Sequence, residues 1–343
     1  MLGRYIRARE RRHATRDTNR VVRPFEWGAE HVVARPNGDD PRAVLERVAR
    51  EGVRRSDLFY ALPDIGDFRL EGDRLTWTSA QRTPAPENDT ARARFFPERR
   101  DGRRGRPGPR RAVVVLPQWN ADAESHVALC RLLARLGIAA LRLTLPYHEE
   151  RRPADLERAD FLVCSNVGRT LQSMRQAVLD ARAAVDWLFR EGYERVGVVG
   201  TSVGSCTGFL AFAHEPRLAA GVFNHVSGYF ADVAWRGIST RHVRAGLEGV
   251  LTLEELRRLW LPISPMPFAE RLLESPARPM RFIAARHDLT FPADLSRDVI
   301  ERVRRLGLPL DVTWLPCGHY TSGERPWVYL DGWKIVTFLR KHL

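Results

Sequence analysis

The feature that most constrains the fold is an alternation, from Ala112 onward, of short apolar runs with segments of helical period. The runs occupy residues 112–117, 138–145, 195–200, 218–226, 280–285 and 310–316. Between them lie apolar stripes at helical spacing, such as Val167 to Leu188 and Leu295 to Leu306. Short apolar runs are typical of parallel strands that helices cover on both faces. The sequence therefore predicts an α/β fold with a doubly wound, mostly parallel sheet.

The segment before this alternation is less regular. Residues 41–53 carry apolar side chains at helical spacing and predict a helix. Residues 66–79 alternate on both sides of Gly72, which predicts a hairpin. A polar stretch of about thirty residues follows, too long for a tight connection, and we expect it to form a surface excursion.

These patterns divide the chain into four parts. Residues 1–65 are expected to be a basic arm and a helix, and residues 66–227 the first part of the α/β core. Residues 228–278 interrupt the alternation with aromatic side chains and a leucine stripe, and they predict short helices inserted as a cap. Residues 279–343 would complete the core.

Positive charge raises the question of nucleic-acid binding. The net charge is +13, and all but two of the 55 basic residues are arginines spread along the whole chain. A codon bias toward arginine gives such uniformity, whereas a binding surface would concentrate the charge, so we expect no nucleic-acid partner. Residues 1–20 and 92–111 are locally rich in arginine, and both are expected to be solvated arms or loops.

Composition places the chain among globular proteins of a reducing compartment. Of 343 residues, 44% are hydrophobic and 28% charged, which excludes collagen-like and wholly disordered classes. The charged N-terminus lacks an apolar stretch and no eighteen consecutive apolar residues occur, so neither a signal peptide nor a membrane-spanning helix is expected. Four scattered cysteines do not suggest a disulfide framework. We expect reduced thiols and a cytoplasmic location.

A candidate nucleophile lies at the end of the third run. Gly200-Thr201-Ser202-Val203-Gly204 follows a buried strand and opens a helical segment. A serine in such a turn takes a strained backbone, and the flanking glycines let strand and helix pass closely. The turn would hold the Ser202 hydroxyl above the sheet edge.

A serine hydroxyl needs a base, and the base needs a group that orients it. Asp288 follows the fifth run and His319 follows the sixth, so both would lie at the edge where parallel strands end. Several alternatives stay open: Asp232 as the acid, His225 as the base, and Asp288 as a helix-capping carboxylate. His287 is expected to point away, and nothing indicates that Cys317 is reactive.

Over residues 66–343 the chain resembles serine hydrolases of the alpha/beta-hydrolase fold, through the Gly-x-Ser-x-Gly turn and the order serine, aspartate, histidine. The resemblance implies Ser202 as nucleophile, His319 as general base and Asp288 as its orienting carboxylate. It also implies an oxyanion hole formed by the N–H of Val203 and by a loop donor, which we expect at Gln118 or Trp119. Pro117-Gln118 replaces the family's common His-Gly pair.

The segment 146–153, Pro-Tyr-His-Glu-Glu-Arg-Arg-Pro, is similar to the branch that includes alpha/beta hydrolase domain-containing protein 18. We expect its charges to form surface ion pairs. The spacings of known zinc, calcium and nucleotide motifs do not occur, so no metal or cofactor is predicted.

The resulting hypothesis is a serine esterase that cleaves a small carboxylic ester through an acyl-enzyme intermediate, with no membrane partner. Four cap aromatics would bind an apolar group of the substrate: Tyr229, Phe230, Trp235 and Trp260. One alternative is a thioesterase or amidase of the same fold, because the same residues attack those bonds. Another is a non-catalytic protein that binds an anionic partner through its arginine-rich arm.

Overall fold

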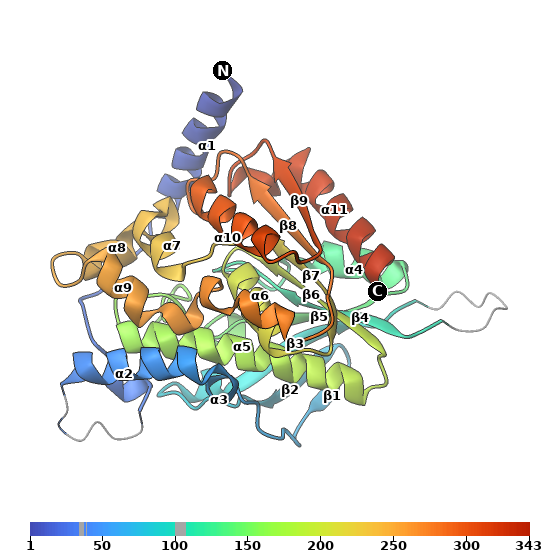
Figure 1. Cartoon of the computed structure of the whole chain (residues 1–343), viewed down its shortest axis with the longest axis horizontal. Coiled ribbons are helices and arrows are strands. Elements are labelled where there is room, and N and C mark those ends of the chain that lie inside the picture. The colour runs from blue at the N-terminus through green and yellow to red at the C-terminus, as the bar shows by residue number, and fades with distance from the viewer. Residues whose placement is uncertain (34–37, 39, 100–107) are drawn as a thin grey trace.

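The computed structural model describes residues 1–33, 38, 40–99 and 108–343 (Figure 1). The centre of the arginine-rich segment 92–111 therefore lies outside the described residues. In the described part of the chain the strands are β1 (Arg69–Glu71), β2 (Arg74–Thr78), β3 (Thr90–Phe96), β4 (Arg111–Leu116), β5 (Ala139–Thr144), β6 (Arg195–Thr201), β7 (Leu218–Asn224), β8 (Met280–Ala285) and β9 (Leu310–Leu315).

These strands form one sheet in the order β1-β2-β3-β5-β4-β6-β7-β8-β9. The pairs β1–β2, β2–β3 and β3–β5 are antiparallel, and every later pair is parallel. All six apolar runs form parallel strands, and the hairpin expected around Gly72 forms β1 and β2. The predicted α/β class with a mostly parallel sheet is confirmed.

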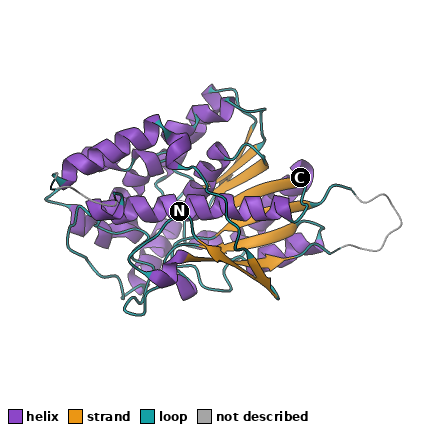
Figure 2. Cartoon of the chain, turned by 90° about the horizontal axis from the view of Figure 1, so that it is seen from below, coloured by secondary structure: helices purple, strands orange, loops and turns teal. Residues whose placement is uncertain are grey.

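Helices cover both faces of the sheet, whose strands fan out in Figure 2. The α-helices among the described residues are α1 (Leu2–Arg16), α2 (Pro41–Arg54), α3 (Ser56–Phe59), α4 (Val127–Arg135), α5 (Val167–Arg190), α6 (Val203–His214), α7 (Phe230–Arg236), α8 (Arg241–Leu247), α9 (Leu253–Leu259), α10 (Ala293–Arg305) and α11 (Trp327–His342). Helices α5, α6 and α10 bury their apolar stripes against one face, and α4 and α11 against the other. The sheet is therefore buried on both sides, as its continuous apolar runs predict.

Two segments differ from the expectation. The polar stretch after β2 is not a plain surface excursion, because residues 90–96 form β3 between β2 and β5. Its buried side chains are Ala91, Ala93 and Phe96, and the two small alanines alternate with arginines and give little apolar signal. Residues 2–16 form helix α1 rather than an irregular arm, and of its side chains only Ile6 and Glu10 are buried.

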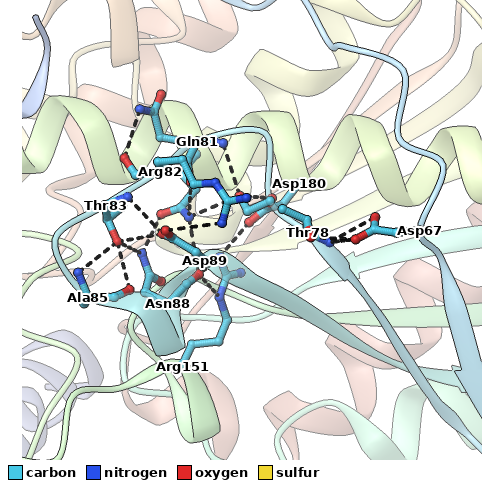
Figure 3. Close-up of polar contacts among 12 residues, drawn as sticks. Asp67, Thr78, Gln81, Arg82, Thr83, Ala85, Asn88, Asp89, Arg151 and Asp180 are labelled. Atoms are coloured by element: carbon cyan, nitrogen blue, oxygen red, sulfur yellow. Dashed lines mark hydrogen bonds and ion pairs between the residues drawn. The ribbon is translucent and has the colours of Figure 1, made fainter. Parts of the chain in front are cut away.

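The segment 146–153 carries buried charge rather than surface ion pairs alone. Arg151 and Asp180 of α5 are fully buried, with Nη2 of the arginine 2.9 Å from Oδ2 of the aspartate. The same guanidinium donates to the carbonyl oxygens of Asn88 and Thr144, and Asp180 Oδ1 accepts from Ser79 (Figure 3). This cluster ties the polar stretch and the segment after β5 to the longest helix.

No described helix is long and apolar enough to cross a membrane. The four cysteines are all free thiols with buried side chains.

Candidate active site

Ser202 occupies the sharp turn between β6 and α6. Its φ is +59°, in the left-handed region that a non-glycine residue rarely adopts. A Cβ on Gly200 would collide with the carbonyl of Gly204, and a Cβ on Gly204 would collide with the carbonyls of Leu116 and Pro117. Both glycines are therefore required by the close passage of helix and strand, and the turn exposes the serine hydroxyl to the cavity described below.

The structure brings together the three residues expected to form a triad. Ser202 Oγ lies 2.9 Å from His319 Nε2, and His319 Nδ1 lies 2.9 Å from Asp288 Oδ2. The three side chains come from the loops after β6, β9 and β8, at the same edge of the sheet. This geometry allows the imidazole to take a proton from the hydroxyl while the carboxylate holds the other ring nitrogen.

Backbone hydrogen bonds hold the Asp288 carboxylate in place independently of its contact with His319. Its Oδ1 accepts hydrogen bonds from the backbone N–H groups of Thr290 and Phe291, at 2.8 and 2.7 Å. Burial favours its neutral form, but the charge of His319 and hydrogen bonds from both neighbouring histidines hold its pKa well below the usual range. Burial also opposes protonation of His319, yet Asp288 raises the pKa of this imidazole above its ordinary value. The pair favours an imidazolium facing a carboxylate.

The alternative acid, Asp232, lies away from the contact between His319 and Asp288. Asp232 is buried, but its two oxygens accept from Arg257 at 2.5 and 2.7 Å, so it does not face the histidine. His287 points away from Ser202 and lies against α1, as expected. Burial raises the pKa of the Cys317 thiol to about 12, which leaves it protonated and unreactive at neutral pH.

His225, considered as an alternative base, is a second imidazole on the same carboxylate. Its Nδ1 lies 3.0 Å from Asp288 Oδ2, and its ring centre lies 4.6 Å from that of His319. Burial, together with the charge of His319, lowers its pKa and favours the neutral ring. Among the described residues, His225, Asp288 and His319 are the group close enough to hold a metal ion. The carboxylate oxygen Oδ2 of Asp288 already contacts both imidazoles.

The loop after β4 lies beside Ser202, and a hydrogen bond to His148 holds it in place. The backbone N–H groups of Val203, Gln118 and Trp119 donate to no residue in the described ranges, and all three residues line the cavity at Ser202. The next N–H, that of Asn120, donates to His148 Nε2 at 2.8 Å. Burial lowers the pKa of His148 to about 4, so its ring is neutral and this nitrogen can accept. The N–H groups of Val203 and of the loop could thus stabilise a developing oxyanion.

The cavity at Ser202 measures about 630 Å³ and lies between the candidate triad and residues of α4, α7 and α11. Of the four aromatics expected to bind substrate, Phe230 lines it, together with Val233 and Ala234 one turn along α7. The expectation for the other three needs correction. Trp260 is fully buried in the core. Trp235 packs against the core and does not line the cavity. Tyr229 borders a separate shallow hollow. A short helix presents a single stripe to the cavity, and the aromatic composition of the segment does not reveal which one.

Helix α1 supports the loop that carries His319, a contact that no sequence pattern predicts. The fully buried Glu10 accepts from the backbone N–H groups of Tyr320 and Thr321, at 3.0 and 2.9 Å. A Cβ on Gly318 would collide with the Glu10 side chain, so the loop closes tightly over it. Ile6 and Glu10 lie one turn apart on the buried face. That spacing is visible in the sequence, but a glutamate at such a position is ordinarily taken for a surface residue.

Comparisons with known proteins find similarity at the level of the fold. No protein-family model matches the chain, and no curated protein is similar to it in sequence. Solved structures do match. Acetyl xylan esterase 1 from Thermoanaerobacterium sp. JW/SL YS485 has a TM-score of 0.59 at 13% identity, over 88% of this chain and 99% of the esterase.

Two other matches have the same architecture. An acylaminoacyl peptidase of Pyrococcus horikoshii has a TM-score of 0.60 at 15% identity over 84% of this chain. The chain spans 44% of the length of that peptidase. A Pyrococcus furiosus esterase has a TM-score of 0.51 at 16% identity, over 80% of this chain and 93% of the esterase. The protein has the alpha/beta-hydrolase fold.

Proposed function

We propose that the protein is a serine hydrolase that cleaves a carboxylic ester through an acyl-enzyme intermediate. The observation that carries this proposal is the chain of two 2.9 Å contacts from Ser202 Oγ through the imidazole of His319 to the carboxylate of Asp288. Two of the similar structures are an acetyl xylan esterase and an esterase, which agrees with an ester substrate. The same nucleophile can also attack thioesters and activated amides.

In this mechanism the Ser202 Oγ attacks the ester carbonyl carbon while His319 Nε2 takes the hydroxyl proton. Asp288 holds the Nδ1–H and stabilises the imidazolium. The N–H of Val203 and that of Gln118 or Trp119 donate to the carbonyl oxygen as it becomes an oxyanion. His319 then protonates the departing alcohol, and water releases the acyl group through the same histidine.

The proposal also covers the cap, segment 146–153 and the cellular location. Residues 228–278 would act as a cap, since Phe230 and its neighbours on α7 line the cavity and offer an apolar surface to the substrate. The similarity of segment 146–153 to the branch that includes alpha/beta hydrolase domain-containing protein 18 stays a prediction. We retain a cytoplasmic location as part of this proposal. The non-catalytic alternative has less support, because Ser202, His319 and Asp288 lie within hydrogen-bond distance in the arrangement that catalysis requires.

The proposal is tested by labelling the intact protein with a fluorophosphonate probe and by assaying 4-nitrophenyl esters from acetate to palmitate. We expect stoichiometric labelling of one serine and turnover of at least one ester. An unlabelled protein that hydrolyses none of the esters would contradict the proposal.

The pH dependence of activity should reflect the raised pKa of His319. The imidazole must be neutral to act as a base, so kcat/KM should fall on the acid side with an apparent pKa above the ordinary histidine value of about 6.5. Asp288→Asn removes the charge that raises this pKa and should move the acid limb to lower pH. The measurement is kcat/KM for a neutral ester between about pH 5 and 9. An acid limb below the ordinary histidine value in the native enzyme would contradict the assignment.

Glu10 should affect the same profile although it lies outside the triad. Glu10→Gln removes a negative charge that raises the pKa of His319, so the acid limb should shift to lower pH. It also replaces a carboxylate oxygen that accepts from the histidine loop, and the resulting displacement of His319 should lower kcat/KM by about tenfold to a hundredfold.

Glu324→Gln is the matched control for Glu10, because Glu324 also joins α1 to this region but contacts Arg9 and His13 at a partly exposed site. It should leave the acid limb in place. An equal shift in the two variants would show that Glu10 acts only through general charge.

A further inference from the structure

Two arginines contribute to one wall of the cavity at Ser202. Arg20, just beyond α1, and Arg158, before α5, both line it. Their side chains are only 12% and 11% exposed, so the two guanidinium groups are held in place rather than extended into solvent. Arginines are seldom buried to this degree unless their charge is used.

Each arginine is next to a part of the proposed catalytic machinery. Arg20 Nη2 donates to the hydroxyl of Tyr320, the residue after His319, at 2.8 Å. The Arg158 guanidinium carbon lies 5.9 Å from the centre of the Trp119 ring, in the loop expected to bind the oxyanion. A substrate bound at Ser202 would therefore have guanidinium groups within the same cavity.

Two carboxylates lie near these arginines, but neither is within hydrogen-bond distance of Arg158. Asp17, which also lines the cavity, is 2.8 Å from Arg20 and 3.8 Å from Arg158. Asp160 lies behind Arg158, at 3.7 Å. Arg158 makes one hydrogen bond within the described ranges, to the neutral side chain of Asn19 at 3.0 Å. Its guanidinium thus retains N–H donors for a further acceptor.

The buried His242 lies on this side of the cavity, where its ring stacks on Trp119. Burial lowers its pKa to about 4, with the charges of Arg20, Arg158 and Arg23 acting in the same direction and Asp17 opposing them. On the α11 side, burial raises the pKa of Asp331 to about 7, so at neutral pH this acid only partly balances the arginines.

We infer that the preferred ester carries a carboxylate group, which pairs with Arg158 while Ser202 attacks the ester carbonyl. The planar guanidinium fork matches the two oxygens of a carboxylate. The net charge of +13 would also favour the approach of an anionic substrate. This inference rests on the proposed hydrolase function and names the substrate class of the same site.

The test compares charged and neutral esters of matched shape. One pair places the carboxylate on the acyl side, with mono-4-nitrophenyl adipate against 4-nitrophenyl hexanoate. A second pair places it on the alcohol side, with 3-carboxyphenyl butyrate against phenyl butyrate. The native enzyme should prefer the charged member of at least one pair by about tenfold or more in kcat/KM, as a charge-assisted hydrogen bond predicts.

Substitution of Arg158 should remove that preference. Arg158→Gln should lower the charged-to-neutral ratio by about tenfold to a hundredfold, and Arg158→Lys should retain part of it. Arg244→Gln is the control, because Arg244 is an exposed arginine paired with Glu248 away from the cavity. It removes the same charge and should change the ratio by less than about twofold.

Two results would overturn the inference: a native ratio below about three in both pairs, or an unchanged ratio in Arg158→Gln. Either one would leave the arginines as structural ties of the N-terminal segment. Because the neutral esters and fluorophosphonate labelling report catalysis independently, failure of the carboxylate preference is distinct from failure of the proposed hydrolase function.

Discussion

Ser202→Ala is expected to abolish fluorophosphonate labelling and to reduce kcat by about 10⁴-fold to 10⁶-fold, by analogy with other serine triads. The effect is large because the substitution removes the atom that would form the acyl-enzyme bond. The N–H groups of Val203 and of the loop after β4 would remain and account for the residual rate. Ester hydrolysis and labelling are measured on the same preparation, and the urea midpoint verifies that the variant is folded.

Ser173→Ala provides the comparison for this variant. Ser173 is also a buried serine, but its hydroxyl donates to backbone carbonyls of Phe161 and Arg169, and it does not line the cavity. It should keep full labelling and turnover. If Ser202→Ala is still labelled and still hydrolyses esters at the native rate, the nucleophile is another residue.

Among substitutions that remove one partner of an ion pair described above, Asp180→Asn should destabilise the protein most. Asp180 and Arg151 are both fully buried, and removal of one partner leaves the other charge uncompensated inside the protein. Breaking a buried pair in this way typically costs about 3–5 kcal/mol in the free energy of unfolding. Since Arg151 also supports the carbonyl of Asn88, the polar stretch before β3 should loosen as well (Figure 3). Equilibrium unfolding in urea measures the loss.

Asp186→Asn, on the same helix, is the matched control. Asp186 pairs with Arg190 and Arg217 at the surface, where water replaces a lost partner, so its substitution should cost about 1 kcal/mol or less. Equal losses in the two aspartate variants would mean that burial of the Arg151–Asp180 pair contributes nothing beyond a surface pair.

The positions of Ser202, Asp288 and His319 could be predicted because their chemistry follows from strand ends. Each residue comes directly after an apolar run, and parallel strands bring their carboxyl ends to one edge of a sheet. The glycines around Ser202 add a local steric requirement that is visible in the sequence. Apolar periodicity and the order of the strands along the chain therefore predict the architecture and the proximity of these three side chains.

Residues whose place depends on distant partners could not be predicted in this way. Glu10, Arg151 and Arg158 have the local pattern of surface residues, yet each is buried against groups far away in the chain. Trp260 has the composition of a binding aromatic, yet it fills the core.

By itself the sequence determined the strands of the parallel sheet and the loops that carry Ser202, Asp288 and His319, because hydrophobic period and glycine sterics act over a few residues. Only the tertiary structure decided which carboxylate faces His319, that α1 supports its loop, and which side chains line the cavity. The physical reason is that burial of a charged or aromatic side chain is favourable only when its partners, contributed by other segments, are in place.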